Sequence, residues 1–160
     1  MPVKRAVKRA PKALGPEAQL RALVARFDAK VQRDFRAVRT ALRKRFPAAN
    51  ELAYDYGTHV VISYSPSENG IEGILATATR PSGVALYFHQ GPKLRDPNGV
   101  LLGKGKSTRY VELRSAADLK DPEIAAFIAA TVKQAGIPFL DQGKGTLIMK
   151  ATAASKRAKR

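Results

Sequence analysis

The sequence predicts an α+β fold: an antiparallel sheet of about four to five strands, covered by a long N-terminal helix and a C-terminal helix, with disordered basic tails. Three observations predict it. Apolar residues recur with a helical period through residues 17–46, and the period changes to two between residues 59 and 113. Both ends of the chain are basic and poor in large apolar residues. A length of 160 residues accommodates one domain with short appendages.

The first predicted helix starts at Gly15-Pro16-Glu17, where a proline and an acidic residue are typical of a first turn, and Pro47 ends it. Its apolar positions follow steps of three or four residues: Leu20, Leu23, Val24, Phe27, Val31, Phe35, Val38, Leu42 and Phe46. Arginines occupy the opposite side: Arg21, Arg26, Arg33, Arg36, Arg39 and Arg43. A solvated surface explains such arginines more often than nucleic-acid binding does, and both interpretations stay open.

Strands are predicted at residues 59–64, 73–80, 84–88 and 107–113, separated by turns rich in Gly and Pro. Residues 90–106 contain many of the glycines and prolines and are expected to form a long ordered loop. A second helix is predicted from Pro122 to about Ala135, with Gly136 as its C-cap. The expected organisation is an N-terminal basic arm at residues 1–14, a single α+β domain at 15–140 and a flexible basic tail at 141–160.

The net charge of +16, from 29 Lys and Arg against 13 Asp and Glu, is concentrated in three segments. Residues 17–46 carry nine basic and three acidic residues, whereas residues 47–149 are balanced. The two ends carry no acidic residue and offer too little apolar side chain to fold on their own. Such arms bind polyanions by releasing counterions, or serve only to keep a protein soluble. The predicted nucleic-acid or polyanion-binding residues are Lys4, Arg5, Lys8, Arg9, Lys12, Lys156, Arg157, Lys159 and Arg160.

No catalytic motif is present in the sequence. The glycine that a phosphate-binding P-loop requires five positions before Gly105 is replaced by Val100, and the segment precedes a predicted strand rather than a helix. Flexible loop residues that could still contact an anion are Lys104, Lys106 and Arg109. There is no Cys, and His59 and His89 lack partners at metal-binding spacing, so we expect no metal, cofactor or thiol chemistry.

Several motifs in the central part of the chain resemble those of the YdhG-like domain family, small bacterial α+β domains mostly of unknown function. They are Val84-Ala-Leu-Tyr-Phe-His-Gln-Gly91, Leu94-Arg-Asp-Pro97, Leu101-Leu-Gly-Lys-Gly-Lys106 and Arg109. The resemblance covers about residues 84–135, and the Trp-containing segment of many members is replaced here by Leu52-Ala-Tyr-Asp-Tyr56. One branch of the family is described as a frataxin-like iron chaperone. Iron favours oxygen ligands, and the positive charge of residues 17–46 opposes its docking there.

The sequence therefore favours a non-enzymatic cytoplasmic YdhG-like protein that binds polyanions, nucleic acid above all, without reading base sequence. The alternatives are a frataxin-like iron chaperone or another module that binds a small ligand or a protein partner. An enzyme acting on an anionic small molecule through Lys104, Lys106 and Arg109 is a third hypothesis. The longest apolar run, residues 124–132, is too short to cross a bilayer, and we expect no membrane association. The oligomeric state is left open.

Overall fold

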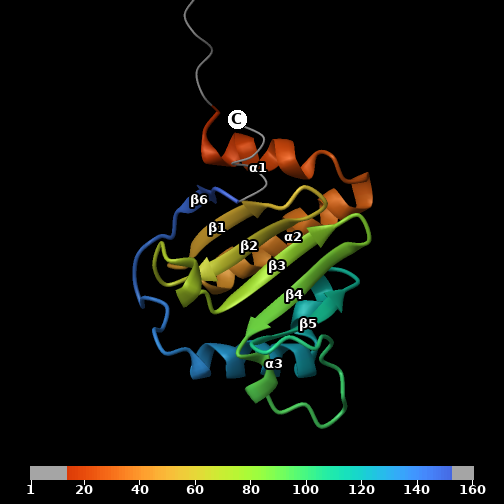
Figure 1. The fold of residues 1–160 in the computed structure, drawn as a ribbon, viewed down its shortest axis with the longest axis vertical. Helices are drawn as coiled ribbons and strands as arrows, with labels where there is room; N and C mark the ends of the chain where they lie inside the picture. Colours follow the sequence, from red (N-terminus) through yellow and green to blue (C-terminus); the bar gives the residue numbers. More distant parts are fainter. Residues whose placement is uncertain (1–13, 153–160) are drawn as a thin grey trace, which may run out of the picture.

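The computed structural model describes residues 14–152. It is an α+β fold in which helices cover one face of a six-stranded sheet (Figure 1). The strands are β1 (Asn50–Asp55), β2 (Val60–Ser65), β3 (Leu75–Arg80), β4 (Gly83–His89), β5 (Thr108–Leu113) and β6 (Leu147–Lys150). The α-helices are α1 (Pro16–Val24), α2 (Ala29–Arg45) and α3 (Pro122–Gln134). Short 3-10 helices are η1 (Gly70–Glu72), η2 (Gly91–Lys93) and η3 (Ala116–Lys120).

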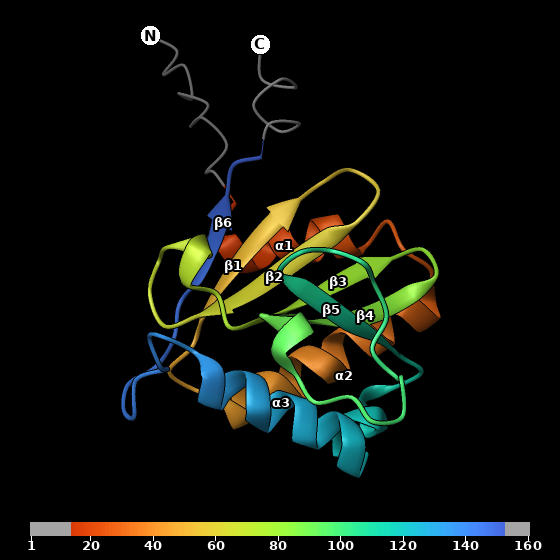
Figure 2. The ribbon, with the colours of Figure 1, turned by 60° about the horizontal axis from the view of Figure 1, so that its bottom comes forward.

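The strands lie in the order β5-β4-β3-β2-β1-β6. The first five strands in the chain form an antiparallel meander, and the four strands predicted from the sequence are all part of it. The sheet differs from the prediction at one edge, where β6 pairs with β1 in parallel, so that it is mixed rather than antiparallel. Figure 2 shows β6 alongside β1. β1 and β6 are the two strands that the sequence did not predict.

The predicted N-terminal helix is two helices, which corrects the expectation of one continuous helix. The chain breaks after Val24, and Asp28 starts α2 as its N-cap by accepting a hydrogen bond from the Val31 amide at 2.9 Å. The apolar spacing passes through the break unchanged, because Val24, Phe27 and Val31 are all buried in the same core. The spacing of apolar residues alone therefore could not reveal the turn between α1 and α2. The residue that indicated it was Asp28, which is of a type that often caps a helix.

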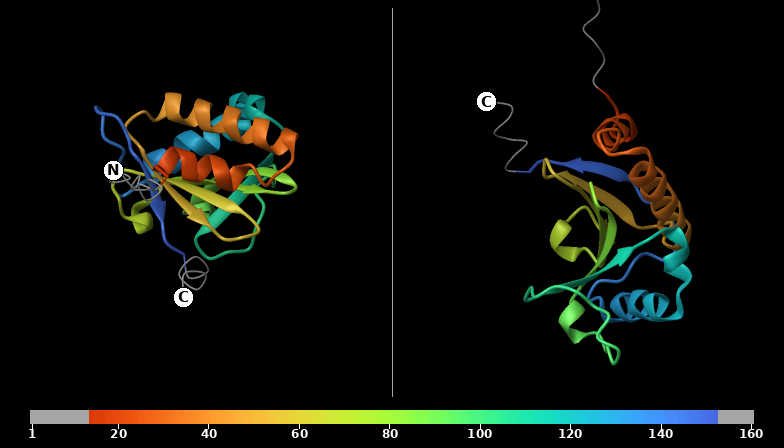
Figure 3. Two further views of the ribbon diagram at one scale, coloured as in Figure 1. Left: turned by 90° about the horizontal axis from the view of Figure 1, so that it is seen from above. Right: turned by 90° about the vertical axis from the view of Figure 1, so that its right-hand side faces the viewer.

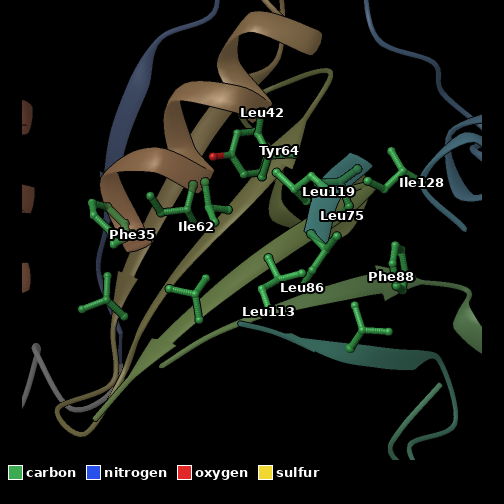
Figure 4. Close-up of a cluster of buried hydrophobic side chains, with 14 of the residues drawn as sticks. Phe35, Leu42, Ile62, Tyr64, Leu75, Leu86, Phe88, Leu113, Leu119 and Ile128 are labelled. Carbon is green, nitrogen blue, oxygen red and sulfur yellow. The ribbon is translucent and has the colours of Figure 1, made fainter. Parts of the chain in front are cut away.

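The core lies between the sheet and the helices. Side chains of a strand alternate between its faces, and Val60, Ile62 and Tyr64 of β2 all face the helices and are at most 1% exposed. Figure 4 shows Ile62 and Tyr64 beneath Phe35 and Leu42 of α2, with Leu75, Leu86 and Phe88 continuing the cluster toward Ile128 of α3. The α-helices therefore cover this face of the sheet only, and loops lie on its other side (Figure 3).

The end of the domain lies beyond the predicted boundary at residue 140. Within the segment predicted as a flexible tail, β6 pairs residue by residue with β1, from Glu51 opposite Leu147 to Tyr54 opposite Lys150. The Gly145 amide also donates to the Pro47 carbonyl at 2.8 Å. Thr152 is buried, and its hydroxyl donates to the Asp55 carbonyl at 2.8 Å. The folded domain therefore reaches at least Thr152.

Candidate functional site

The helical side carries a groove between α1 and α2, with a volume of about 440 Å³. Its apolar residues include Leu20 and Val24 from α1 and Phe35 from α2, which are largely buried in the core. Its charged residues are Glu17, Arg21, Arg36, Arg39 and Arg43. We call this surface the arginine groove. It exists because the chain folds back after Val24, which a single continuous helix would not allow.

Arg39 is the central ion-pairing residue beneath the groove. Its Nε and Nη2 donate to Glu51 Oε2 and Oε1 at 2.9 and 2.8 Å, and its Nη1 and Nη2 donate to Glu17 Oε2 and Oε1 at 2.9 and 2.8 Å. The Tyr64 hydroxyl donates to Glu51 Oε2 at 3.2 Å. This network joins α1, α2, β1 and β2, and its Arg39 and Glu51 side chains are largely removed from water, whereas Glu17 is about half exposed.

The network shifts the pKa of each of three groups. The hydrogen bond from Arg39 lowers the pKa of Glu17. Burial lowers the pKa of Arg39, but the hydrogen bonds to Glu17 and Glu51 outweigh it and the net shift is upward. Complete burial, reinforced by the charge of Glu51, raises the pKa of Tyr64 well above its ordinary value. All three groups stay in the protonation states that hold the network together at neutral pH.

The other arginines of the groove are more available to a ligand. Within residues 14–152, Arg21 and Arg36 are exposed and form no ion pair, and Arg43 lies 3.9 and 3.6 Å from the carboxylates of Glu17 and Glu51. Arg39 differs from the sequence prediction of a solvated arginine, because its side chain is only 13% exposed. The arginines of α2 are thus divided between a structural role and a free, solvent-facing one.

The predicted anion-binding loop is not preorganised around a ligand. Lys104 and Lys106 are exposed between the isolated bridge at Leu102 and the start of β5. Arg109 turns its Nη1 onto the carbonyl oxygens of Gly105 and Thr108, so this donor is already occupied. Lys104, Lys106 and Arg109 are close in space because they are close in the sequence. Their role in anion binding stays a prediction.

The nine predicted polyanion-binding residues in the two tails lie outside the described residues. The residues to which the two tails are attached lie within the described part of the chain. Leu14 precedes α1 and Thr152 follows β6, and α1 packs beside β6. Both ends of the described chain therefore lie at the same end of the molecule, the N-terminal one at α1 and the C-terminal one at the far end of β6 (Figures 1 and 3). Sequence alone could not place them together, because this depends on the parallel pairing of β6 with β1.

Neither histidine is part of a metal centre in the described part of the chain, where no group of three or more His, Asp or Glu side chains is placed to hold an ion. His89 ends β4, and burial lowers the pKa of its imidazole. His59 precedes β2, stacks on Tyr56 at 5.0 Å between ring centroids and contacts the Thr58 hydroxyl at 3.0 Å. Among residues 14–152, no helix combines the length and apolar character that crossing a membrane requires.

Comparison of the chain with protein-family models, with curated proteins and with solved structures finds no match. The function is therefore inferred from the chemistry of the surfaces described above.

Proposed function

We propose that this protein binds polyanions, nucleic acid above all, through the phosphate backbone and without reading base sequence. The observation that carries the proposal is that the described chain begins and ends at the end of the molecule that carries α1. Because α1 also forms one side of the arginine groove, one extended ligand can contact the groove and both tails.

The distribution of ion pairs supports this interpretation. Six of the thirteen acidic side chains form ion pairs within the described domain, among them Asp55 with Arg26 at 2.8 Å, Glu112 with Arg80 at 3.0 Å and Asp118 with Arg114 at 3.4 Å. The nine basic residues of the tails exceed the seven acidic side chains that form no ion pair there. A polyphosphate supplies the complementary charge, and its binding releases condensed counterions.

The same features favour backbone contacts over base recognition. Free arginines and lysines contact phosphate oxygens of any sequence, whereas base recognition needs side chains fixed against the edges of the bases. Arg39, whose side chain is only 13% exposed, is directed at Glu17 and Glu51 rather than outward. The predicted binding is therefore strongly dependent on salt and weakly dependent on sequence.

The proposal can be tested by fluorescence anisotropy with a labelled DNA duplex of arbitrary sequence, over a series of salt concentrations. In one full-length variant all nine basic residues of segments 1–13 and 153–160 are replaced by Gln. A second carries Arg21→Gln, Arg36→Gln and Arg43→Gln. The matched control carries Lys93→Gln, Lys120→Gln and Lys133→Gln, three exposed cations remote from the groove.

We expect the tail variant to lose most of the affinity. If all nine cations contact duplex phosphates, they account for about −8 in the slope of log K against log salt. The groove variant should lose affinity to a smaller extent, and the control variant should bind almost as the wild type does. Salt-insensitive binding, or equal affinity of the tail variant and the control, would contradict the proposal.

The iron-chaperone alternative draws no support from the described residues, where no cluster of oxygen ligands is formed. The relation to YdhG-like domains stays a hypothesis that rests on the sequence motifs.

A further inference from the structure

The face of the sheet opposite the helices carries a second hollow, with a volume of about 380 Å³. Its strand residues belong to the face of the sheet that Figure 3 shows opposite the helices, whereas the arginine groove lies between α1 and α2. The residues that line it are His59, Val61, Ala76, Ala78, Arg80, Tyr87, His89 and Thr108. We call it the sheet hollow.

The floor of the sheet hollow is made of small apolar side chains. In the register of the sheet, Val61 lies opposite Ala78, and Ala76 lies opposite Tyr87. All four point to the face away from the helices, because the alternate residues Ile62, Thr77 and Leu86 are in the helix-covered layer. Alanine at positions 76 and 78, which are neighbours on this face of β3, leaves space that larger residues would fill.

Two groups of stacked rings border this floor. On the β1–β2 side, Tyr54 stacks on Tyr56 with ring centroids 6.1 Å apart, and Tyr56 stacks on His59 at 5.0 Å. On the β4–β5 side, Tyr87 stacks on Tyr110 at 4.7 Å. The two flanking strands β2 and β4 are about 10 Å apart, since each lies one strand spacing from β3. A space of this width, bordered by rings and floored by methyl groups, suits a flat apolar ligand.

Arg80 provides the single full cationic side chain of the lining, and no Asp or Glu lines the hollow. Its Nη2 donates to Glu112 Oε1 at 3.0 Å, but Glu112 is mostly exposed. The Arg80 Nε is buried and has no acceptor within residues 14–152. A buried donor that lacks a partner costs free energy, and the Arg80 side chain, which is 27% exposed, would reduce this cost by turning its guanidinium toward an anionic oxygen in the hollow.

We propose that the sheet hollow binds a small planar aromatic carboxylate, with its ring on Val61, Ala76 and Ala78 and its carboxylate at Arg80. Charge complementarity selects the anion, and the aromatic borders select the flat ring. The site goes beyond the proposed polyanion binding, which uses other residues on another side of the molecule, so either proposal can fail without the other.

The probe for the test is 2-naphthoate, with the uncharged 2-naphthalenemethanol as its matched neutral analogue. Amide shifts in proton–nitrogen NMR spectra of the full-length protein report where each binds. We expect saturable shifts at Val61, Ala78 and Tyr87 with 2-naphthoate. Arg80→Met should weaken 2-naphthoate about tenfold or more, the loss of a hydrogen bond to a charged group. Arg80→Lys should recover part of this loss.

Arg114→Met is the control, because Arg114 is an exposed arginine with a similar ion pair that does not line the hollow. It should leave 2-naphthoate affinity unchanged, and Arg80→Met should leave the weaker binding of the neutral analogue unchanged. Ala78→Leu, which fills the floor, should abolish binding of both probes, and thermal unfolding checks that each variant is folded. Shifts centred on Arg21 and Arg36, equal affinity of wild type and Arg80→Met, or unchanged binding by folded Ala78→Leu would overturn the proposal.

Discussion

Arg39 and Glu51 form a two-pronged ion pair between α2 and β1, with Nε to Oε2 at 2.9 Å and Nη2 to Oε1 at 2.8 Å. The Glu51 side chain is only 5% exposed, and that of Arg39 13%. The pair lies where the helix layer meets β1, the strand next to the edge strand β6, and Glu17 extends it to α1. It fixes the position of α1 and α2, and with them the arginine groove.

We expect Arg39→Met to destabilise the fold by about 3–5 kcal/mol, because it leaves the Glu51 carboxylate buried without its partner. The measurement is urea unfolding followed by circular dichroism. Arg36→Met is the matched control on the same helix, since Arg36 is exposed and unpaired within the described domain, and it should change the free energy of unfolding by less than about 0.5 kcal/mol.

The double variant Arg39→Met/Glu51→Leu removes both charges and should recover much of the lost stability. If Arg39→Met and Arg36→Met proved equally mild, the ion pair would not hold the layers together.

The lowered pKa of Glu17 predicts a loss of stability in acid. A carboxyl group whose pKa is lower in the folded state stabilises the fold above its unfolded pKa, and this stabilisation is lost as the pH falls through the folded value. The free energy of unfolding should therefore decrease as the pH falls below about 4.5, the ordinary value for this group. Asp55 and Asp118, whose pKa values are also lowered by hydrogen bonds, act in the same direction below 3.8.

Urea midpoints measured across this acidic range should fall less steeply for Glu17→Gln than for the wild type. Because the Glu17 side chain is 53% exposed, the difference will be modest and will shrink with added salt. Glu68→Gln, at an exposed residue with no ion pair in the described structure, should follow the wild-type curve. A Glu17→Gln profile parallel to that of the wild type would contradict the assignment.

Gly145 leads into β6 where the chain passes very close to the backbone before β1. A Cβ at this position would come within 1.7 Å of the Ala49 carbonyl oxygen, so Gly145→Ala must displace either β6 or the start of β1. We expect a lowered thermal midpoint, together with faster amide exchange at Ile148 and Met149. Gly136→Ala is the control, since a Cβ there meets nothing within 4 Å.

The location of the domain boundary can be tested in the same way. Removal of residues 153–160 should leave the thermal midpoint unchanged, whereas removal of residues 141–160 uncovers the edge of β1 and should lower it. Equal midpoints for the two truncations would show that β6 contributes little to the fold.

The sequence was sufficient to predict the features that depend on local periodicity. The strands β2 to β5, the amphipathic spacing of α2 and the start of α3 at Pro122 were predicted from neighbouring residues, and all were confirmed. The α+β class followed from their order. The break between α1 and α2 was missed because the apolar spacing continues across it, even though Asp28 caps the second helix.

Only the tertiary structure decided the features that depend on distant partners. The short strand β6 has only a weak pattern of alternating residues. It forms because it pairs in parallel with β1, nearly one hundred residues earlier in the chain. Arg39 looked like any other arginine until Glu17 and Glu51 were placed on either side of it. The sheet hollow likewise arises from Ala76 and Ala78 only once rings from other strands surround them. The spacing of apolar residues indicates which face of a helix or strand is buried. It does not indicate which distant segments of the chain pair with one another, because that depends on the three-dimensional arrangement.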